Sequence, residues 1–276
     1  MKFSVSICVY NEDNHSYLKE ALDSILNQTL QPDQIVLVVD GPIKQKLENV
    51  IINFKNQLVN LLDFKIIRLK LNKGHGDARR IGINNTKYNL VALADADDIN
   101  VFDRFEKQIN IFEKDNSYSI VGSQIIEIDH DSKEPLQKRI VPIEDNDIKD
   151  LMRERCPMNQ MTVMFKKNDI NSVGGYRDFY HNEDYYLWIR MLLGNLKFYN
   201  LHNYLVLARI NKLFYHRRGG IKYFLSEYRL QKYMLVKNVI KFPRFIYNVS
   251  IRFCLQIVLT ENLRALIFLK LARKKI

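Results

Sequence analysis

Short apolar runs alternate with helical patterns through the first hundred residues of this 276-residue chain. Apolar runs of the kind found in buried strands predict strands at Phe3–Val9, Ile35–Val39, Phe64–Leu69 and Leu90–Ala94. Apolar residues at helical spacing predict helices at Tyr17–Leu26, Leu47–Leu58 and about Ala78–Asn85. This order is typical of a mostly parallel central sheet with helices on both faces. We therefore expect an α/β fold whose ligands bind beyond the carboxyl ends of the strands.

The remainder of the chain is less regular. Its patterns predict strands at Ser119–Ile128, Arg139–Val141 and Thr162–Phe165, and helices at Ile148–Arg153 and Glu183–Leu193. From residue 219 onward we expect long helices rich in aromatic and basic residues. A change of composition near residue 210 separates an α/β domain at 1–210 from a helical, basic region at 211–276.

The net charge of +11 lies entirely in the last quarter of the chain. Residues 209–276 contain 16 Lys and Arg against two acids, Glu227 and Glu261, which gives +14 and leaves −3 for residues 1–208. Such a basic region suits nucleic acid, an anionic membrane surface or an anionic substrate, and it could equally be a solvated tail.

Three cysteines, Cys8, Cys156 and Cys254, are too far apart for a zinc site or a disulfide framework, and we expect them to be buried and inert. The first residues are typical of a strand rather than of a secretory signal. The longest uncharged stretch near the end, Phe253–Thr260, is far shorter than the ~18–20 residues that span a bilayer. A cytosolic protein is expected, with contact to a membrane left open.

An acidic turn, Asp95-Ala96-Asp97-Asp98, directly follows the apolar run that ends at Ala94. Three carboxylates this close repel one another unless a cation lies among them, and oxygen ligands suit Mg²⁺ or Mn²⁺. The alternative is a solvated turn in which Asp98 or Asp103 caps the next helix. The position of the turn after a buried strand favours the cation site.

Three further polar segments lie near expected strand or helix ends. Asp40 could accept hydrogen bonds from a nucleoside, or simply form a turn before Gly41-Pro42. The loop at 72–80, NKGHGDARR, has glycines and cations that suit phosphate, or it could be a flexible surface loop. We expect His75 in this loop to be incidental rather than a ligand. Glu183-Asp184 could supply a general base, or only complement the helix dipole. GxGxxG and GxxxxGK[ST] motifs are absent, which disfavours a dinucleotide-dependent dehydrogenase or a P-loop enzyme.

Six motifs then occur in a familiar order: SVSICVYNE, VVDGP, NKGHGDARR, LADADD, GGYRD and EDYYLWIR. Together they resemble the family 2 glycosyltransferases, whose GT-A fold is Rossmann-like, and in particular enzymes that assemble amylovoran and O-antigen repeat units. The resemblance covers roughly residues 3–220. It implies a nucleotide-sugar half at about 1–100 and an acceptor half at about 101–210.

The resemblance also implies roles for individual residues. A divalent cation, Mn²⁺ or Mg²⁺, would be bound by Asp97, while Asp95 would hold the ribose and metal-bound water. The general base would be Asp184, on a helix supported by Trp188 and Arg190. The remaining nucleotide-side positions are Val9, Tyr10, Glu12, Asp40, Lys73 and Arg79.

The implied reaction is inverting, non-processive transfer from a nucleotide-sugar, a UDP-hexose, to a polyprenyl-diphosphate-linked saccharide in surface polysaccharide assembly. The QxxRW motif of processive synthases is absent. Gln160 stands where relatives often have His, which leaves the acceptor side open. The implied location is cytoplasmic, with peripheral contact to the inner face of the cytoplasmic membrane and no nucleic acid as partner. Two alternatives are a sugar-nucleotide nucleotidyltransferase, which would need a glycine-rich basic loop after the first strand, and a basic nucleic-acid-binding protein, for which no recognised module is present.

Overall fold

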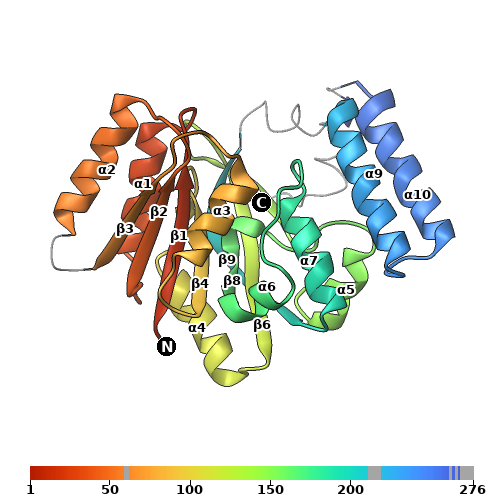
Figure 1. The fold of residues 1–276 in the computed structure, drawn as a ribbon, viewed down its shortest axis with the longest axis horizontal. Coiled ribbons are helices and arrows are strands. Elements are labelled where there is room, and N and C mark those ends of the chain that lie inside the picture. Colours follow the sequence, from red (N-terminus) through yellow and green to blue (C-terminus); the bar gives the residue numbers. More distant parts are fainter. Residues whose placement is uncertain (59–61, 211–218, 261–262, 265–266, 268–276) are drawn as a thin grey trace.

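The computed structural model describes residues 1–58, 62–210, 219–260, 263–264 and 267. A single sheet runs through the molecule in the order β3-β2-β1-β4-β8-β6-β9-β5, and β7 pairs with β6 (Figure 1). The strands are β1 Phe3–Val9, β2 Gln34–Val39, β3 Asp63–Arg68, β4 Leu90–Asp95, β5 Ile99–Asn100, β6 Tyr118–Asp129, β7 Pro135–Arg139, β8 Met164–Lys166 and β9 Lys197–Ile210. The α-helices are α1 His15–Leu26, α2 Gln45–Gln57, α3 His75–Asn84, α4 Arg104–Lys114, α5 Asp145–Met152, α6 Lys167–Ser172, α7 Glu183–Leu193, α9 Ile221–Val236 and α10 Phe242–Phe253.

The first four strands in space, β3, β2, β1 and β4, are parallel. In the register of this sheet, Val9 lies beside Val39, and Cys8 lies beside Asp95. The carboxyl ends of these strands therefore meet at one edge, where the segments at 10–14, 40–44, 69–74 and 95–98 gather. Beyond β4, strand β8 is antiparallel to both β4 and β6, while β9 runs parallel to β6. The expected mostly parallel sheet is confirmed.

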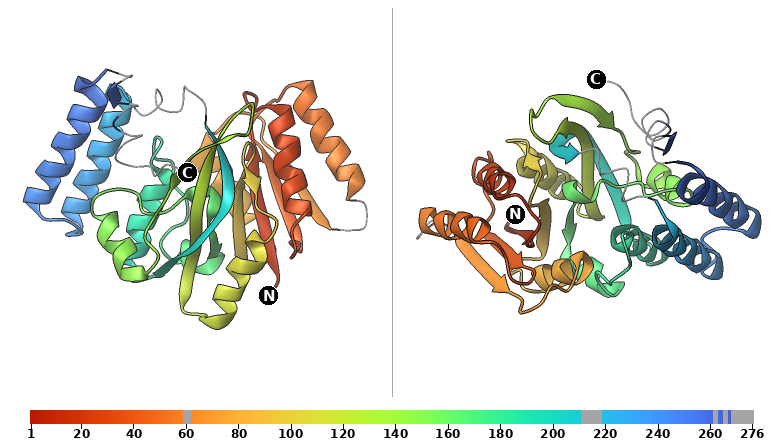
Figure 2. Two further views of the ribbon diagram at one scale, coloured as in Figure 1. Left: turned by 180° about the vertical axis from the view of Figure 1, so that it is seen from behind. Right: turned by 90° about the horizontal axis from the view of Figure 1, so that it is seen from above.

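Helices cover both faces of the sheet, as Figure 2 shows from above. On one face the alternate residues of β1, such as Val5 and Ile7, pack with α1, α2 and α4 in one apolar cluster. The other face packs against α3, α5, α6 and α7. Strand β4 contributes to both clusters, since Ala92 belongs to the first and Leu93 to the second. A strand buried on both faces must be apolar throughout, which explains the uninterrupted run before the acidic turn.

The two C-terminal helices lie side by side at the end of the molecule opposite α2 (Figures 1 and 2). Leu230, Met234 and Phe245 are buried in the same cluster as Trp188 of α7. A buried ion pair joins the helices, with Arg252 Nε 2.5 Å from Glu227 Oε2. Helices α9 and α10 are thus packed onto the α/β domain. Among the residues that the structure describes, no helix combines the length and apolar character needed to cross a membrane.

Several predicted boundaries were wrong for local physical reasons. Helix α3 begins at His75 rather than Ala78, because Gly74 adopts φ +84° and ends the preceding loop there. The strand predicted at 139–141 lies instead at Pro135–Arg139. It does not continue to Val141, since the Val141 N–H donates to the Gln124 side chain instead of to a strand partner. The strand predicted from Thr162 starts at Met164, after a 3₁₀ turn at Gln160–Thr162.

Strand β9, the longest in the sheet, was not predicted. Its pairing with β6 shifts register between Ser123 and Gln124 and again between Gln124 and Ile125, so its side chains do not alternate regularly. The expectation that all three cysteines are buried was also wrong. Cys8 and Cys156 are half-buried, whereas Cys254, at the end of α10, is exposed.

Candidate active site

Asp40, at the end of β2, is buried and holds the loop that follows β3. Its Oδ1 accepts a hydrogen bond from the Lys73 N–H at 2.7 Å, and its Oδ2 accepts one from the Gly74 N–H at 3.1 Å. The neighbouring Gly41 adopts φ +86°, and a Cβ there would lie 2.7 Å from the Asn72 nitrogen. The loop therefore approaches the end of β2 closely and directs the chain into α3.

Arg79 of α3 and Asp95 at the end of β4 form a buried ion pair. The Arg79 side chain is 2% exposed, and its Nη2 lies 2.5 Å from Asp95 Oδ1. Burial alone would raise the pKa of Asp95, but the charge on Arg79 outweighs it and holds that pKa below its usual value. Asp95 is therefore a fixed, ionised carboxylate at the carboxyl edge of the sheet.

The three carboxyl groups of the acidic turn converge. Oxygens from Asp95, Asp97 and Asp98 all lie within 4.8 Å of one another. Asp98 is buried and accepts the Arg209 N–H at 2.9 Å, and burial together with the charges on Asp97 and Asp95 raises its pKa well above the usual value. Asp97 is exposed. Such mutual repulsion is what a divalent cation relieves, and the all-oxygen donor set suits Mg²⁺ or Mn²⁺.

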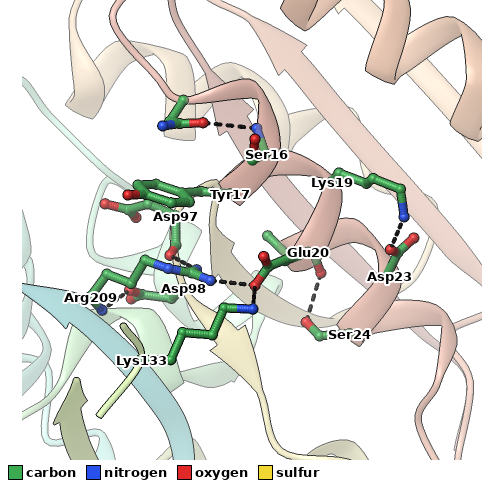
Figure 3. Close-up of polar contacts among 12 residues, drawn as sticks. Ser16, Tyr17, Lys19, Glu20, Asp23, Ser24, Asp97, Asp98, Lys133 and Arg209 are labelled. Atoms are coloured by element: carbon green, nitrogen blue, oxygen red, sulfur yellow. Dashed lines mark hydrogen bonds and ion pairs between the residues drawn. The ribbon is translucent and has the colours of Figure 1, made fainter. Parts of the chain in front are cut away.

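Arg209, near the end of β9, connects the acidic turn to helix α1 (Figure 3). Its Nη1 donates to the backbone carbonyl of Asp97, and its Nη2 lies 2.5 Å from Glu20 Oε2 on α1. The guanidinium also stacks over the Tyr17 ring at 4.5 Å, and Lys133 reaches the same Glu20 oxygen at 2.8 Å. Sequence reasoning missed Arg209, whose only signal is a single arginine within the apolar run LVLARI.

Asp13 is a second residue that sequence reasoning missed. Its Oδ2 accepts the Tyr10 N–H at 2.9 Å. Burial raises the pKa of Asp13 to about 7, and the charges on Asp97 and Asp95 add to that increase. The loop after β1 therefore brings a fourth carboxyl group to the acidic turn, and its signal was its place at the end of the YNED segment.

Helix α7 opens with the acid pair Glu183-Asp184. The Glu183 side chain is 10% exposed, and its Oε1 lies 3.0 Å from His75 Nδ1. Asp184 is half-buried; its Oδ1 accepts the Tyr185 N–H at 2.6 Å and its Oδ2 lies 3.8 Å from Cys156 Sγ. Burial, followed by the charge on Glu183, raises the pKa of Asp184 to about 6. A carboxylate with that pKa is suited to accept a proton near neutral pH.

Two residues hold α7 in place, in the manner predicted. Trp188 is fully buried, and its ring meets that of Tyr176 edge-on at 6.3 Å. Arg190 donates from Nη1 to the Val173 carbonyl and from Nη2 to the Gly175 carbonyl, each at 2.7 Å. The helix is thereby tied to the Gly174-Gly175 turn.

The other predicted nucleotide-side residues lie at the same edge of the sheet. The Val9 side chain packs in the core, and its carbonyl accepts the Asp40 N–H at 2.8 Å. Tyr10 is 41% exposed, and Lys73 is also exposed. Glu12 is exposed and lies 3.3 Å from Lys44 Nζ. The first-strand loop, the 72–74 loop and the acidic turn thus lie at one edge of the sheet, while Val9 can present only its backbone.

Comparison with known proteins bears on this arrangement. The model of the family described as "Glycosyl transferase family 2" matches residues 4–182. The chain belongs to this family. The match ends one residue before Glu183, so the acids of α7 lie just beyond it.

Family 2 relatives match the chain over most of its length. It is 35% identical, over 99% of its length and 97% of the relative's, to an Escherichia coli UDP-Gal:alpha-D-GlcNAc-diphosphoundecaprenol beta-1,3-galactosyltransferase. It is 36% identical to the amylovoran biosynthesis glycosyltransferase AmsE of Erwinia amylovora, with 88% of this chain and 89% of AmsE covered. The enzyme is therefore a glycosyltransferase, and the two alternative functions gain no support.

A solved structure shares the fold. TarS 1–349 of S. aureus, in complex with UDP-GlcNAc, superposes with a TM-score of 0.67 at 17% identity, covering 92% of this chain and 73% of that one. The chain spans 44% of the longer TarS chain. The predicted GT-A architecture is confirmed.

Proposed function

We propose that this family 2 enzyme is an inverting, non-processive hexosyltransferase that uses a UDP-sugar and a lipid-diphosphate-linked saccharide. One observation carries the proposal. The donor-side acids after β4 and the acid pair of α7 lie at the same edge of the sheet, joined by hydrogen bonds through Arg79 and His75. This arrangement provides separate groups for the leaving diphosphate and for the attacking hydroxyl.

Asp184 is the proposed general base. Its carboxylate would take the proton of the acceptor hydroxyl as that oxygen attacks the anomeric carbon, an effect of about 10²–10⁴ in rate. A single displacement requires one such base and inverts the anomeric configuration, so an α-linked donor gives a β-linked product. Asp184→Asn, which keeps the side chain's size, is expected to lower transfer by at least about 10² while donor binding is retained. Transfer near the wild-type rate would exclude Asp184 as the base.

Asp97 is the proposed metal ligand, with Asp95 beside it. A bound Mn²⁺ or Mg²⁺ would stabilise the negative charge that develops on the leaving nucleoside diphosphate. Asp98 contributes differently, because its Oδ1 is occupied by the Arg209 N–H and its side chain is buried. Loss of transfer on addition of EDTA, restored by Mn²⁺, would support this assignment, and undiminished transfer in EDTA would contradict it.

The proposed nucleotide-binding side consists of the loops after β1, β2 and β3. Tyr10, Glu12 and Lys73 are exposed there and can contact a ligand with their side chains. Arg79 is buried against Asp95, so it would act on the nucleotide through that carboxylate. Asp40 would serve the uracil side while it keeps the 72–74 loop in place.

The relatives support the choice of substrates. The E. coli relative is named for UDP-Gal and an α-D-GlcNAc-diphosphoundecaprenol acceptor. Both substrates are tested with a panel of donors, each supplied with Mn²⁺ and a lipid-linked GlcNAc diphosphate. The donors are UDP-galactose, UDP-glucose, UDP-GlcNAc, GDP-mannose and TDP-glucose. Transfer from a UDP-sugar alone is the expected result. Transfer only from a GDP- or TDP-sugar, or none from any donor, would contradict the proposal.

We also propose that residues 1–210 form the catalytic domain, with donor and acceptor halves at about 1–100 and 101–210. The helical region at 211–276 is proposed to contact the cytoplasmic membrane. Apolar side chains at helical spacing are exposed on α10, among them Phe242 at 62% and Ile246 at 47%. Exposed lysines precede them at Lys237 and Lys241. This combination suits the interface of an anionic bilayer.

Truncation is a poor test of membrane contact, because α9 and α10 share the core of α7. The double variant Phe242→Ser/Ile246→Ser instead changes only side chains that are exposed on α10. We expect it to lower flotation with phosphatidylglycerol vesicles by about tenfold. Ile52→Ser on α2, 45% exposed, is the matched control and should float like wild type. Equal flotation of all three proteins would refute membrane contact through α10.

A further inference from the structure

A chain of polar contacts links the acid pair of α7 to the acidic turn. His75 Nδ1 lies 3.0 Å from Glu183 Oε1, and Arg79 Nε donates to His75 Nε2 at 3.1 Å. Arg79 Nη2 continues to Asp95 Oδ1 at 2.5 Å. Because the Arg79 Nε–H can only donate, Nε2 of His75 must accept, and the ring proton therefore lies on Nδ1, where it donates to Glu183. The His75 imidazole thus bridges the two halves of the site.

The first turns of α3 and α7 are packed tightly around this bridge. A Cβ at Gly76 would lie 3.3 Å from the Arg177 carbonyl oxygen and 3.4 Å from Glu183 Cβ. Glycine at this position allows the residue before it, His75, to reach Glu183. The His75 side chain remains 53% exposed at the rim of the site, so it contributes little to the apolar core.

Glu183 depends on this contact for its charge. Burial would raise its pKa, but the hydrogen bond from His75 is the leading one of the interactions that together lower it. Without His75, the buried carboxylate would lose the partner that favours its ionised form and its present orientation.

We propose that His75 is a positioning residue that holds Glu183, and with it the adjacent Asp184, in register with the Arg79–Asp95 pair on the donor side. The inference rests on the proposed function, because it needs Asp184 as the base. Displacement of a reacting group by about 1 Å costs on the order of 10² in rate, so loosening the start of α7 should reduce turnover. Donor binding should change little, since Arg79 loses only its Nε contact with His75 and keeps the 2.5 Å contact between its Nη2 and Asp95 Oδ1.

The test uses the full chain with His75→Ala and His75→Asn, each alone and with Glu183→Ala. Transfer is measured with UDP-galactose and Mn²⁺, or with the panel donor that wild type uses fastest. We expect His75→Ala to lower kcat by about 10–100-fold with the donor KM within about twofold. His75→Asn, whose amide N–H can occupy the place of Nδ1, should recover kcat to within about threefold of wild type. The midpoint of thermal unfolding should move by less than about 2 °C.

The decisive comparison is the double variant. If His75 acts through Glu183, His75→Ala lowers kcat no further when Glu183 is already Ala. Additive losses, or a kcat for His75→Ala within twofold of wild type, would overturn the inference alone. If His75→Ala fails to fold, His75→Asn provides the test instead. Loss of activity in His75→Asn would then also overturn the inference. A wild-type chain that turns over no donor of the panel would instead overturn the proposed function, and this inference with it.

Discussion

The acid limb of the pH–rate profile gives the sharpest test of the proposed site. Asp184 must be ionised to act as a base, and its pKa is raised to about 6. About one-tenth of the enzyme then carries the ionised base at pH 5 and about nine-tenths at pH 7. The rate of transfer should therefore rise about tenfold between these two pH values and level off above.

Glu183→Gln is the informative perturbation. It removes the negative charge beside Asp184 but keeps a side-chain oxygen that can accept from His75. After burial, the charge on Glu183 is the largest influence that raises the pKa of Asp184. Loss of a neighbouring negative charge makes ionisation easier, so the midpoint must fall below 6. The ratio of rates between pH 7 and pH 5 should then be clearly smaller than tenfold.

The assay is nucleotide release at saturating donor and acceptor between about pH 4.5 and pH 8, with the metal concentration held fixed. Asp13→Asn is the necessary control, because the pKa of Asp13 is raised to about 7 and its ionisation could produce a similar limb. Two results would refute the reasoning. The first is a midpoint that stays at 6 in Glu183→Gln, and the second is a limb that vanishes in Asp13→Asn.

Three further predictions follow from single contacts. Arg79→Met should lower the free energy of unfolding in urea by about 3–5 kcal/mol, because it leaves Asp95 charged and unpaired, and an unchanged midpoint would contradict the ion pair. Asp97→Asn should weaken Mn²⁺ binding at least about tenfold, because one carboxylate ligand is lost, and electron paramagnetic resonance measures this binding. Thermal stability should be unchanged, because Asp97 is exposed. Gly82→Ala should cost about 1–3 kcal/mol, since its Cβ would lie 2.4 Å from Ser6 Oγ; wild-type stability in urea would show that the helix can shift.

The parts of this protein that could be predicted from the sequence are those governed by local periodicity. Strands β1 to β4 and helix α1 follow from apolar runs and helical spacing, and their order predicts a parallel sheet with the candidate site at its carboxyl edge. The acidic turn could be placed there because the strand before it is apolar on both faces. Helix α7 was predicted with its observed bounds, since its apolar residues recur at helical spacing.

What could not be predicted depends on pairs that are distant in the chain. His75 and Glu183 are 108 residues apart, and no local pattern indicates that their side chains meet. The register shifts in the β6–β9 pair hid strand β9, and with it Arg209. A single histidine in a glycine-containing loop has no characteristic spacing, so the sequence predicts no role for His75.

Arg209 also shows why counting acids cannot identify a metal ligand. The acidic turn supplies three aspartates, but the fold gives each a different task. Asp95 is tied to Arg79, and Asp98 is buried where the Arg209 N–H occupies one of its oxygens. Arg209 donates to the backbone carbonyl of Asp97, whose residue is exposed at the edge of the sheet. A cation that binds together with a diphosphate enters the site from solvent and needs a carboxylate that solvent can reach. The exposure of Asp97 is therefore the reason why it is the proposed ligand.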